Sequence, residues 1–364
     1  MNRMERFALL LLFGFTIFYF NTVYAAPLSE DGSGSGDGDE DNSEDSVSCE
    51  ELSQSVKGFC KIDAAKERCS TLCEGDPDLE LKCGQRDVSG SKRIINGKEA
   101  KKGAWPWHLN VREYSEEAKK LKRNGKQFCA ATIITKNFAV APAHCFSKHA
   151  MGKDRSKLAS SYKVMAGEHD KRNKNEKSRQ EVALKYIILN DLSVKQYVNI
   201  SESKSDFYVA KNNIAIIKFK SPLNLGGMVA AACLSKDAPT DECYTYGHGY
   251  NKDFKLSPTL QELKMPVIST DECNEKEVYN NTVDEETICA GYGGDDDRAA
   301  CNYDGDLACK NGDTWFLNGV LSTMKFAKPN PETHWCQNIE ENYALYTNVA
   351  KHMDWIIKSI LDHN

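Results

Sequence analysis

Fourteen cysteines constrain this chain more than any other feature of its sequence. They are an even number, and they are spread from Cys49 to Cys336. A cytosolic chain seldom holds so many thiols unless they cluster as metal ligands. The distribution therefore predicts disulfide bonds formed in an oxidising compartment.

The N-terminus predicts secretion. Two arginines precede an apolar run over residues 7–20, and residues 23–25 place small side chains where signal peptidase requires them. The run is short for a membrane span, which needs roughly 20 residues. We expect residues 1–25 to be a signal peptide, and no membrane span to remain after its removal. An uncleaved membrane anchor is the alternative.

Residues 26–48 predict a disordered acidic leader. Eight acidic residues lie between Glu30 and Asp45 among glycines and serines, so the segment has almost nothing to bury. The net charge of −6 comes from this stretch, and the rest of the chain is mildly basic. Ser33 and Ser35, each followed by glycine, resemble attachment sites for glycosaminoglycans. A solvated spacer is the alternative.

Residues 49–93 form a cysteine-rich pro-region. The part over 49–73 is too small for a core of its own and must rely on cross-links. The stretches Gly58–Cys60 and Cys69–Cys73 resemble the second half of the ShK-type toxin domain, although that domain has six cysteines. An unclassified disulfide knot is the alternative, and the sequence leaves open the pairing among Cys49, Cys60, Cys69 and Cys73.

Beyond residue 92 the sequence predicts an all-β domain. Short runs rich in β-branched residues recur between turn residues, at 131–134, 162–165 and 214–219. The last residues differ, because their apolar side chains fall on one helical face after Asn348, a suitable N-cap. A composition of 40% hydrophobic and 27% charged residues excludes a membrane bundle and a fully disordered chain.

Five motifs in order identify residues 94–364 as a member of the chymotrypsin-like serine protease family. They are the activation junction Arg93–Gly97, Trp105–Trp107, the histidine motif Ala143–Cys145, the strand start Asn213–Ile217, and Tyr346–Val349 with Trp355. The resemblance implies a double six-stranded β-barrel with a C-terminal helix.

The resemblance also implies five disulfides and leaves the four N-terminal cysteines to pair among themselves. The implied pairs are Cys129–Cys145, Cys243–Cys309, Cys273–Cys289, Cys301–Cys336 and Cys83–Cys233.

Two of the three catalytic positions of the family are substituted. His144 stands at the position of the general base, but Asn213 replaces the orienting aspartate, a change that costs about four orders of magnitude in rate in a working protease. Aligned from Cys301, Gly305 replaces the nucleophilic serine, and no serine occurs between Ser269 and Ser322. The segment to the next cysteine is also two residues shorter than in the family, which disturbs the oxyanion hole.

Other family sites have changed as well. Ala299 falls where trypsin-like members carry an aspartate that selects Lys and Arg substrates. In the loop that binds Ca²⁺ in the family, Glu168 matches but Arg179 replaces a second carboxylate. A guanidinium would substitute for the charge of the ion. We therefore expect no metal and no cofactor.

Features of zymogen activation remain. Arg93 offers a basic cleavage site, and Asp304 matches the aspartate that pairs with the freed N-terminus, here Ile94. Cleavage could therefore act as a conformational switch. Inheritance without use is the alternative.

Basic loops and glycosylation sequons suggest extracellular partners. The loops expected on one side of the cleft gather like charges that favour a polyanion, with a solvated face as the alternative. Asn199 and Asn280 open N-glycan sequons. The candidate polyanion-binding residues are Lys119, Lys120, Lys122, Arg123, Lys171, Arg172, Lys174 and Lys177.

The sequence thus predicts a secreted, non-catalytic serine protease homologue that binds extracellular proteins, proteases or their substrates, and that could bind a glycosaminoglycan. We expect no nucleic-acid partner. A peptidase with unusual catalysis and a matrix or proteoglycan component are the alternatives.

Overall fold

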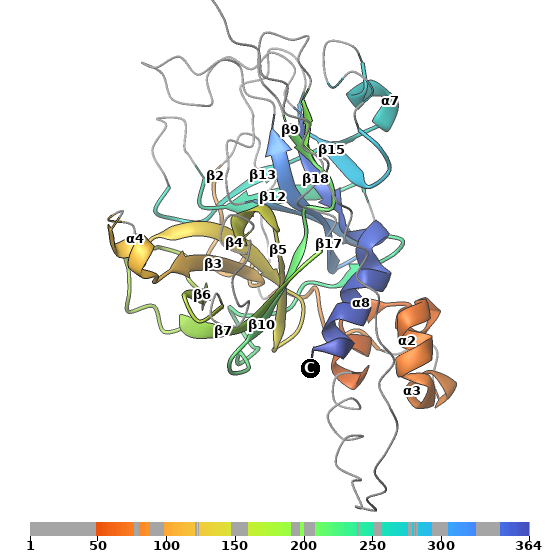
Figure 1. Ribbon diagram of the computed structural model, residues 1–364, viewed down its shortest axis with the longest axis horizontal. Coiled ribbons are helices and arrows are strands. Elements are labelled where there is room, and N and C mark those ends of the chain that lie inside the picture. Colours follow the sequence, from red (N-terminus) through yellow and green to blue (C-terminus); the bar gives the residue numbers. More distant parts are fainter. Residues whose placement is uncertain are drawn as a thin grey trace, which may run out of the picture. The chain divides into compact units, whose positions relative to one another are not determined.

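The protein is described by a computed structural model (Figure 1). Its contacts divide the chain into two units, 1–40 and 41–364, and the described residues belong to the second. They are residues 49–75, 80–86, 98–120, 122, 124–146, 159–190, 197–199, 208–238, 240–249, 257–275, 279, 281, 283–292, 305–324 and 343–363.

Six antiparallel strands close into a barrel in the order β10-β5-β4-β3-β6-β7. The apolar runs predicted as strands lie in three of them, β4, β6 and β10. The strands are β3 (His108–Glu113), β4 (Gln127–Ile133), β5 (Phe138–Ala141), β6 (Tyr162–Ala166), β7 (Gln180–Leu189) and β10 (Ala215–Phe219).

The second sheet has eight strands in the order β14-β15-β18-β17-β16-β12-β13-β2. Its strands are β2 (Lys98–Glu99), β12 (Cys243–Gly247), β13 (Gln261–Lys264), β14 (Val267–Ile268), β15 (Thr287–Ala290), β16 (Asp306–Asn311), β17 (Thr314–Met324) and β18 (Ala344–Asn348).

This sheet curls on itself. Strands β13 and β14 lie near opposite ends of the strand order, yet two residues, Met265 and Pro266, separate them along the chain. Proline has no N–H for the ladder, so it divides what would otherwise be one bent strand. Counted that way, and without the short β2, the sheet has six strands, the number predicted for the second barrel, but it forms a half-barrel, because its strand order does not pair β13 with β14.

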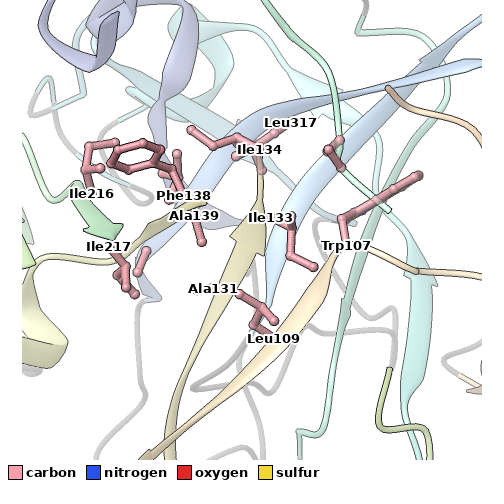
Figure 2. Close-up of a cluster of buried hydrophobic side chains, with 14 of the residues drawn as sticks. Trp107, Leu109, Ala131, Ile133, Ile134, Phe138, Ala139, Ile216, Ile217 and Leu317 are labelled. Atoms are coloured by element: carbon pink, nitrogen blue, oxygen red, sulfur yellow. The ribbon is translucent and has the colours of Figure 1, made fainter. Parts of the chain in front are cut away.

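One hydrophobic core joins the two barrels. Figure 2 shows side chains from β3, β4, β5 and β10 packed together with Leu317 of β17. Trp107 lies at the edge of this cluster and is fully buried. Side chains of the two barrels therefore bury apolar surface against each other. This burial holds the strand ends of one barrel in place against those of the other.

The C-terminus forms the predicted helix. The Asn348 side chain accepts a hydrogen bond from Ala350 N at 3.2 Å and so caps the 3₁₀ turn η2 (Val349–His352), which leads into α8 (Met353–Asp362). The predicted apolar face of α8, including Met353, Ile356 and Ile360, is buried. Two short helices lie on loops, α4 (Glu116–Lys120) and α7 (Thr270–Cys273).

The cysteine-rich part packs on the protease-like part. It contains β1 (Val56–Lys57), η1 (Phe59–Lys61), α2 (Asp63–Arg68) and α3 (Ser70–Gly75), and its disulfides are Cys49–Cys69 and Cys60–Cys73. Strand β1 pairs in parallel with β11 (Leu234–Ser235), and α2 lies beside α8 (Figure 1), where Arg68 and Asp362 form an ion pair of 2.6 Å. Its buried Phe59 and Ile62 belong to the common core. This part therefore buries its apolar side chains against the protease-like part, because it is too small to form a core of its own.

The next segment is held at several points. Cys83 is bonded to Cys233. Gly84 adopts φ 67° and donates to Ala231 O at 2.7 Å, and a Cβ there would lie 2.5 Å from Trp315 O, so glycine alone fits. The Arg86 guanidinium lies 4.3 Å from the Trp315 ring centroid.

Three further disulfides implied by the resemblance are also present, Cys129–Cys145, Cys243–Cys309 and Cys273–Cys289. The remaining implied pair, Cys301–Cys336, lies outside the described residues.

Within the described ranges, no helix combines the length and the apolar character that crossing a bilayer requires.

A buried pair of histidines lies where the two barrels meet. The ring centroids of His108 on β3 and His248 after β12 are 5.6 Å apart. Burial lowers the pKa of His108 to about 4. Its hydrogen bond to Asn110 opposes this effect and the charge of Lys171 adds to it, and both contributions are smaller than that of burial. Burial, His108 and Lys171 lower the pKa of His248 to about 2, with His169 adding a smaller effect.

Because the pKa values of both histidines are lowered, we expect the folded protein to lose stability in mild acid. Their pKa values are lower in the folded chain than the ordinary value near 6.5, so the unfolded chain binds more protons as the pH falls below 6.5. Between pH 7 and pH 5 we expect each histidine to lower the free energy of unfolding by about 2 kcal/mol. Urea unfolding at the two pH values measures this difference.

The control is a pair of substitutions. His248→Gln should reduce the difference between pH 7 and pH 5, whereas Leu225→Gln, which places the same residue at an exposed position without a titratable group, should leave it unchanged. Equal pH dependence in all three proteins would contradict the assignment to the buried pair.

Candidate active site

The pairing of two strands brings His144 and Asn213 together. His144 follows β5 in a turn that the Cys129–Cys145 disulfide holds, and Asn213 precedes β10. In the ladder of these two strands, Ala215 faces Ala141. The residues just beyond the paired ends must therefore meet, although 69 positions separate them in the sequence.

Two hydrogen bonds of 2.8 Å join these residues. One runs from the backbone N–H of His144 to Asn213 Oδ1, and the other joins Asn213 Nδ2 and His144 Nδ1. Because a backbone N–H can only donate, the amide oxygen must be the atom that faces it. The amide nitrogen then faces Nδ1 and donates to it. A neutral imidazole that accepts at Nδ1 carries its proton on Nε2.

The second barrel fixes the same amide. Asn213 is 1% exposed, its Nδ2 also lies 3.4 Å from Ser322 Oγ on β17, and its backbone oxygen accepts from Thr347 Oγ1 on β18 at 3.3 Å. His144 is half-buried beside it. The amide therefore bonds at both its oxygen and its nitrogen, which opposes any flip that would exchange them.

The residue that the sequence predicts at the position of the family nucleophile is a glycine, which has no side chain. Gly305 is buried and comes directly before β16. The next residue, Asp306, is also buried, and Thr132 Oγ1 donates to its Oδ2 at 2.5 Å. No motif marks Asp306, so its attachment to the first barrel could not be read from the sequence.

The predicted activation residues Arg93, Ile94 and Asp304 lie outside the described residues, as does Ala299 at the specificity position. Their roles stay predictions. Strand β8 (Tyr197–Asn199) pairs with β9 (Tyr208–Ala210) and places the sequon residue Asn199 opposite Tyr208. The second sequon residue, Asn280, also lies outside the described residues.

Cationic side chains surround Glu168 in the loop that binds Ca²⁺ in the family. The Arg179 Nε lies 3.2 Å from Glu168 Oε1, as the substitution at this position suggested. Arg112 adds a second guanidinium, 2.6 Å from Oε2, and Asn110 Nδ2 donates to the same oxygen at 2.8 Å. The role of Arg112 could not be read from the sequence, because a single arginine in a strand carries no motif. Among the described side chains, no group of three or more His, Cys, Asp or Glu could hold a metal ion.

The structure brings the two segments that contain the candidate polyanion-binding residues together. Lys171 Nζ donates to Gln127 Oε1 at 3.0 Å, which joins the loop around residues 168–179 to the end of the insertion that contains α4. Carboxylates already partner some of the cations, since Glu116 pairs with Lys119 and Asp170 with Arg172. Arg123 lies outside the described residues.

Comparison with known families agrees with this fold. The family model described as Trypsin matches residues 94–356, a range that contains His144, Asn213 and Gly305. The match starts at the residue after Arg93, where the sequence places the activation junction, and covers most of the chain. The chain therefore belongs to the trypsin family, the chymotrypsin-like serine proteases.

Proposed function

We propose that this chain is a secreted trypsin-family protein without peptidase activity, which acts by binding other extracellular proteins. The observation that carries this proposal is the pair of hydrogen bonds between His144 and Asn213. A general base in acyl transfer needs a lone pair on Nε2 to take the proton of the nucleophile, and an aspartate at Nδ1–H maintains that tautomer. Here the amide donates to Nδ1, so Nε2 carries a proton and cannot accept another in the neutral ring.

The missing nucleophile supports the same proposal. Gly305 offers no hydroxyl, and the nearest serines along the chain, Ser269 and Ser322, lie outside this segment. Ser322 Oγ lies 3.4 Å from the amide of Asn213 and so lies on the Nδ1 side of His144. In this reaction the nucleophile bonds to Nε2, on the other side of the ring. Acyl transfer would therefore lack both its nucleophile and its base.

A covalent probe tests the absence of activity. We expect protein cleaved after Arg93 to show no labelling by a fluorophosphonate and no turnover of a broad peptide library above a His144→Ala control. Gly305→Ser alone should stay inactive, because Asn213 still holds the wrong tautomer. Labelling of the unsubstituted protein that disappears in the His144→Ala variant would contradict the proposal.

We propose a sulfated glycosaminoglycan as one partner of the two joined basic loops. Lys120, Lys122, Lys174 and Lys177 are exposed, and no carboxylate of the described residues forms an ion pair with them. Clustered cations repel one another, and a polyanion would relieve that repulsion. The acidic residues of the same loops reduce the net charge, so the expected binding is moderate and sensitive to salt.

Elution from a heparin column tests this partner. Changing Lys120, Lys122, Lys174 and Lys177 together to alanine should lower the salt concentration at which the protein elutes. The matched control changes four exposed lysines on other elements, Lys185, Lys220, Lys264 and Lys358. Because both variants lose the same charge, equal shifts would show that the loops contribute nothing beyond net charge.

A further inference from the structure

Strand β16 begins directly after Gly305 and is attached to its neighbours at both ends. In the ladder with β12, Cys309 faces Cys243 and Asp306 faces Tyr246. The Cys243–Cys309 disulfide fixes one end of this pairing. The other end, beside Gly305, is fixed by side chains that cross to the first barrel.

Asp306 is one of these side chains and contacts the first barrel. Asp306 is 3% exposed, and its carboxylate accepts a hydrogen bond of 2.5 Å from Thr132 Oγ1. Thr132 belongs to β4 of the first barrel and is fully buried. A buried carboxylate is stable only while donors satisfy it, so the start of β16 is held against β4.

A third residue completes the attachment. The Tyr246 hydroxyl lies 3.0 Å from Thr132 Oγ1. Threonine has a single hydroxyl proton, and a carboxylate can only accept, so that proton lies toward Asp306 and Tyr246 must donate to threonine. Burial and the charge of Asp306 raise the pKa of Tyr246 well above its ordinary value, so this hydroxyl keeps the proton that it donates.

These bonds exist in the continuous chain, with Arg93 and Ile94 still joined. We propose that Asp306 is a positioning residue that fixes Gly305 and the start of β16 before any cleavage, so that cleavage after Arg93 leaves this part of the site unchanged. The inference does not depend on whether the domain is catalytic.

Hydrogen exchange at residues 306–309 tests the proposal. The unsubstituted protein is compared before and after limited cleavage, with the cut after Arg93 verified by mass. We expect exchange rates to agree within twofold, because the Tyr246–Thr132–Asp306 chain is already formed. A tenfold or greater slowing on cleavage would overturn the proposal, and this comparison needs no variant.

A pair of substitutions tests the role of the hydroxyl. Thr132→Val keeps the shape of the side chain but removes the donor, and we expect at least tenfold faster exchange at residues 306–309. Thr132→Ser retains the hydroxyl and should behave like the unsubstituted protein. Exchange in β7 and β10 serves as the internal reference for folding. Equal rates in the valine and serine variants would overturn the role of the Thr132–Asp306 bond.

Discussion

The backbone N–H of His144 donates to Asn213 Oδ1 at 2.8 Å, and this bond sets the orientation of the amide. The orientation decides which ring nitrogen of His144 accepts a hydrogen bond and which carries the proton. The site thereby presents a donor where a protease of this family presents an acceptor. We propose that this exchange of one oxygen for one nitrogen removes the general base, while the fold that brings the two residues together stays the same.

The two barrels supply the framework for this arrangement. Pairing of β5 with β10 places the histidine beside the asparagine, while β17 and β18 of the second sheet hold the asparagine from the other side. The bond from Thr132 to Asp306 crosses between the same barrels. Contacts between the barrels therefore position the site, and the shared apolar core in Figure 2 holds the barrels together.

Sequence reasoning predicted the fold because its signals are local. The β-branched runs marked the strands β4, β6 and β10, and the helical spacing after Asn348 marked α8. A motif also marked the position of Asn213. The direction in which its amide points could not be read from the sequence, because it depends on a backbone N–H at the end of another strand.

The contacts that the sequence could not predict join distant residues by polar side chains. Arg112 meets Glu168 across 56 positions, and Thr132 meets Asp306 across 174. Neither pair has a spacing or a residue type that marks it in advance. The packing of the cysteine-rich part on α8 escaped prediction for a similar reason, because its apolar residues resemble those of any small disulfide-linked segment.

The protonation of the His144 ring tests this account most directly. Long-range ¹H–¹⁵N correlation spectra near neutral pH distinguish the two ring nitrogens, and a His144→Gln variant identifies the signals. We predict a protonated Nε2 and an unprotonated Nδ1 in the unsubstituted protein, and the reverse arrangement in Asn213→Asp. A proton on Nδ1 in the unsubstituted protein would contradict the account, because His144 would then hold the tautomer of a working base.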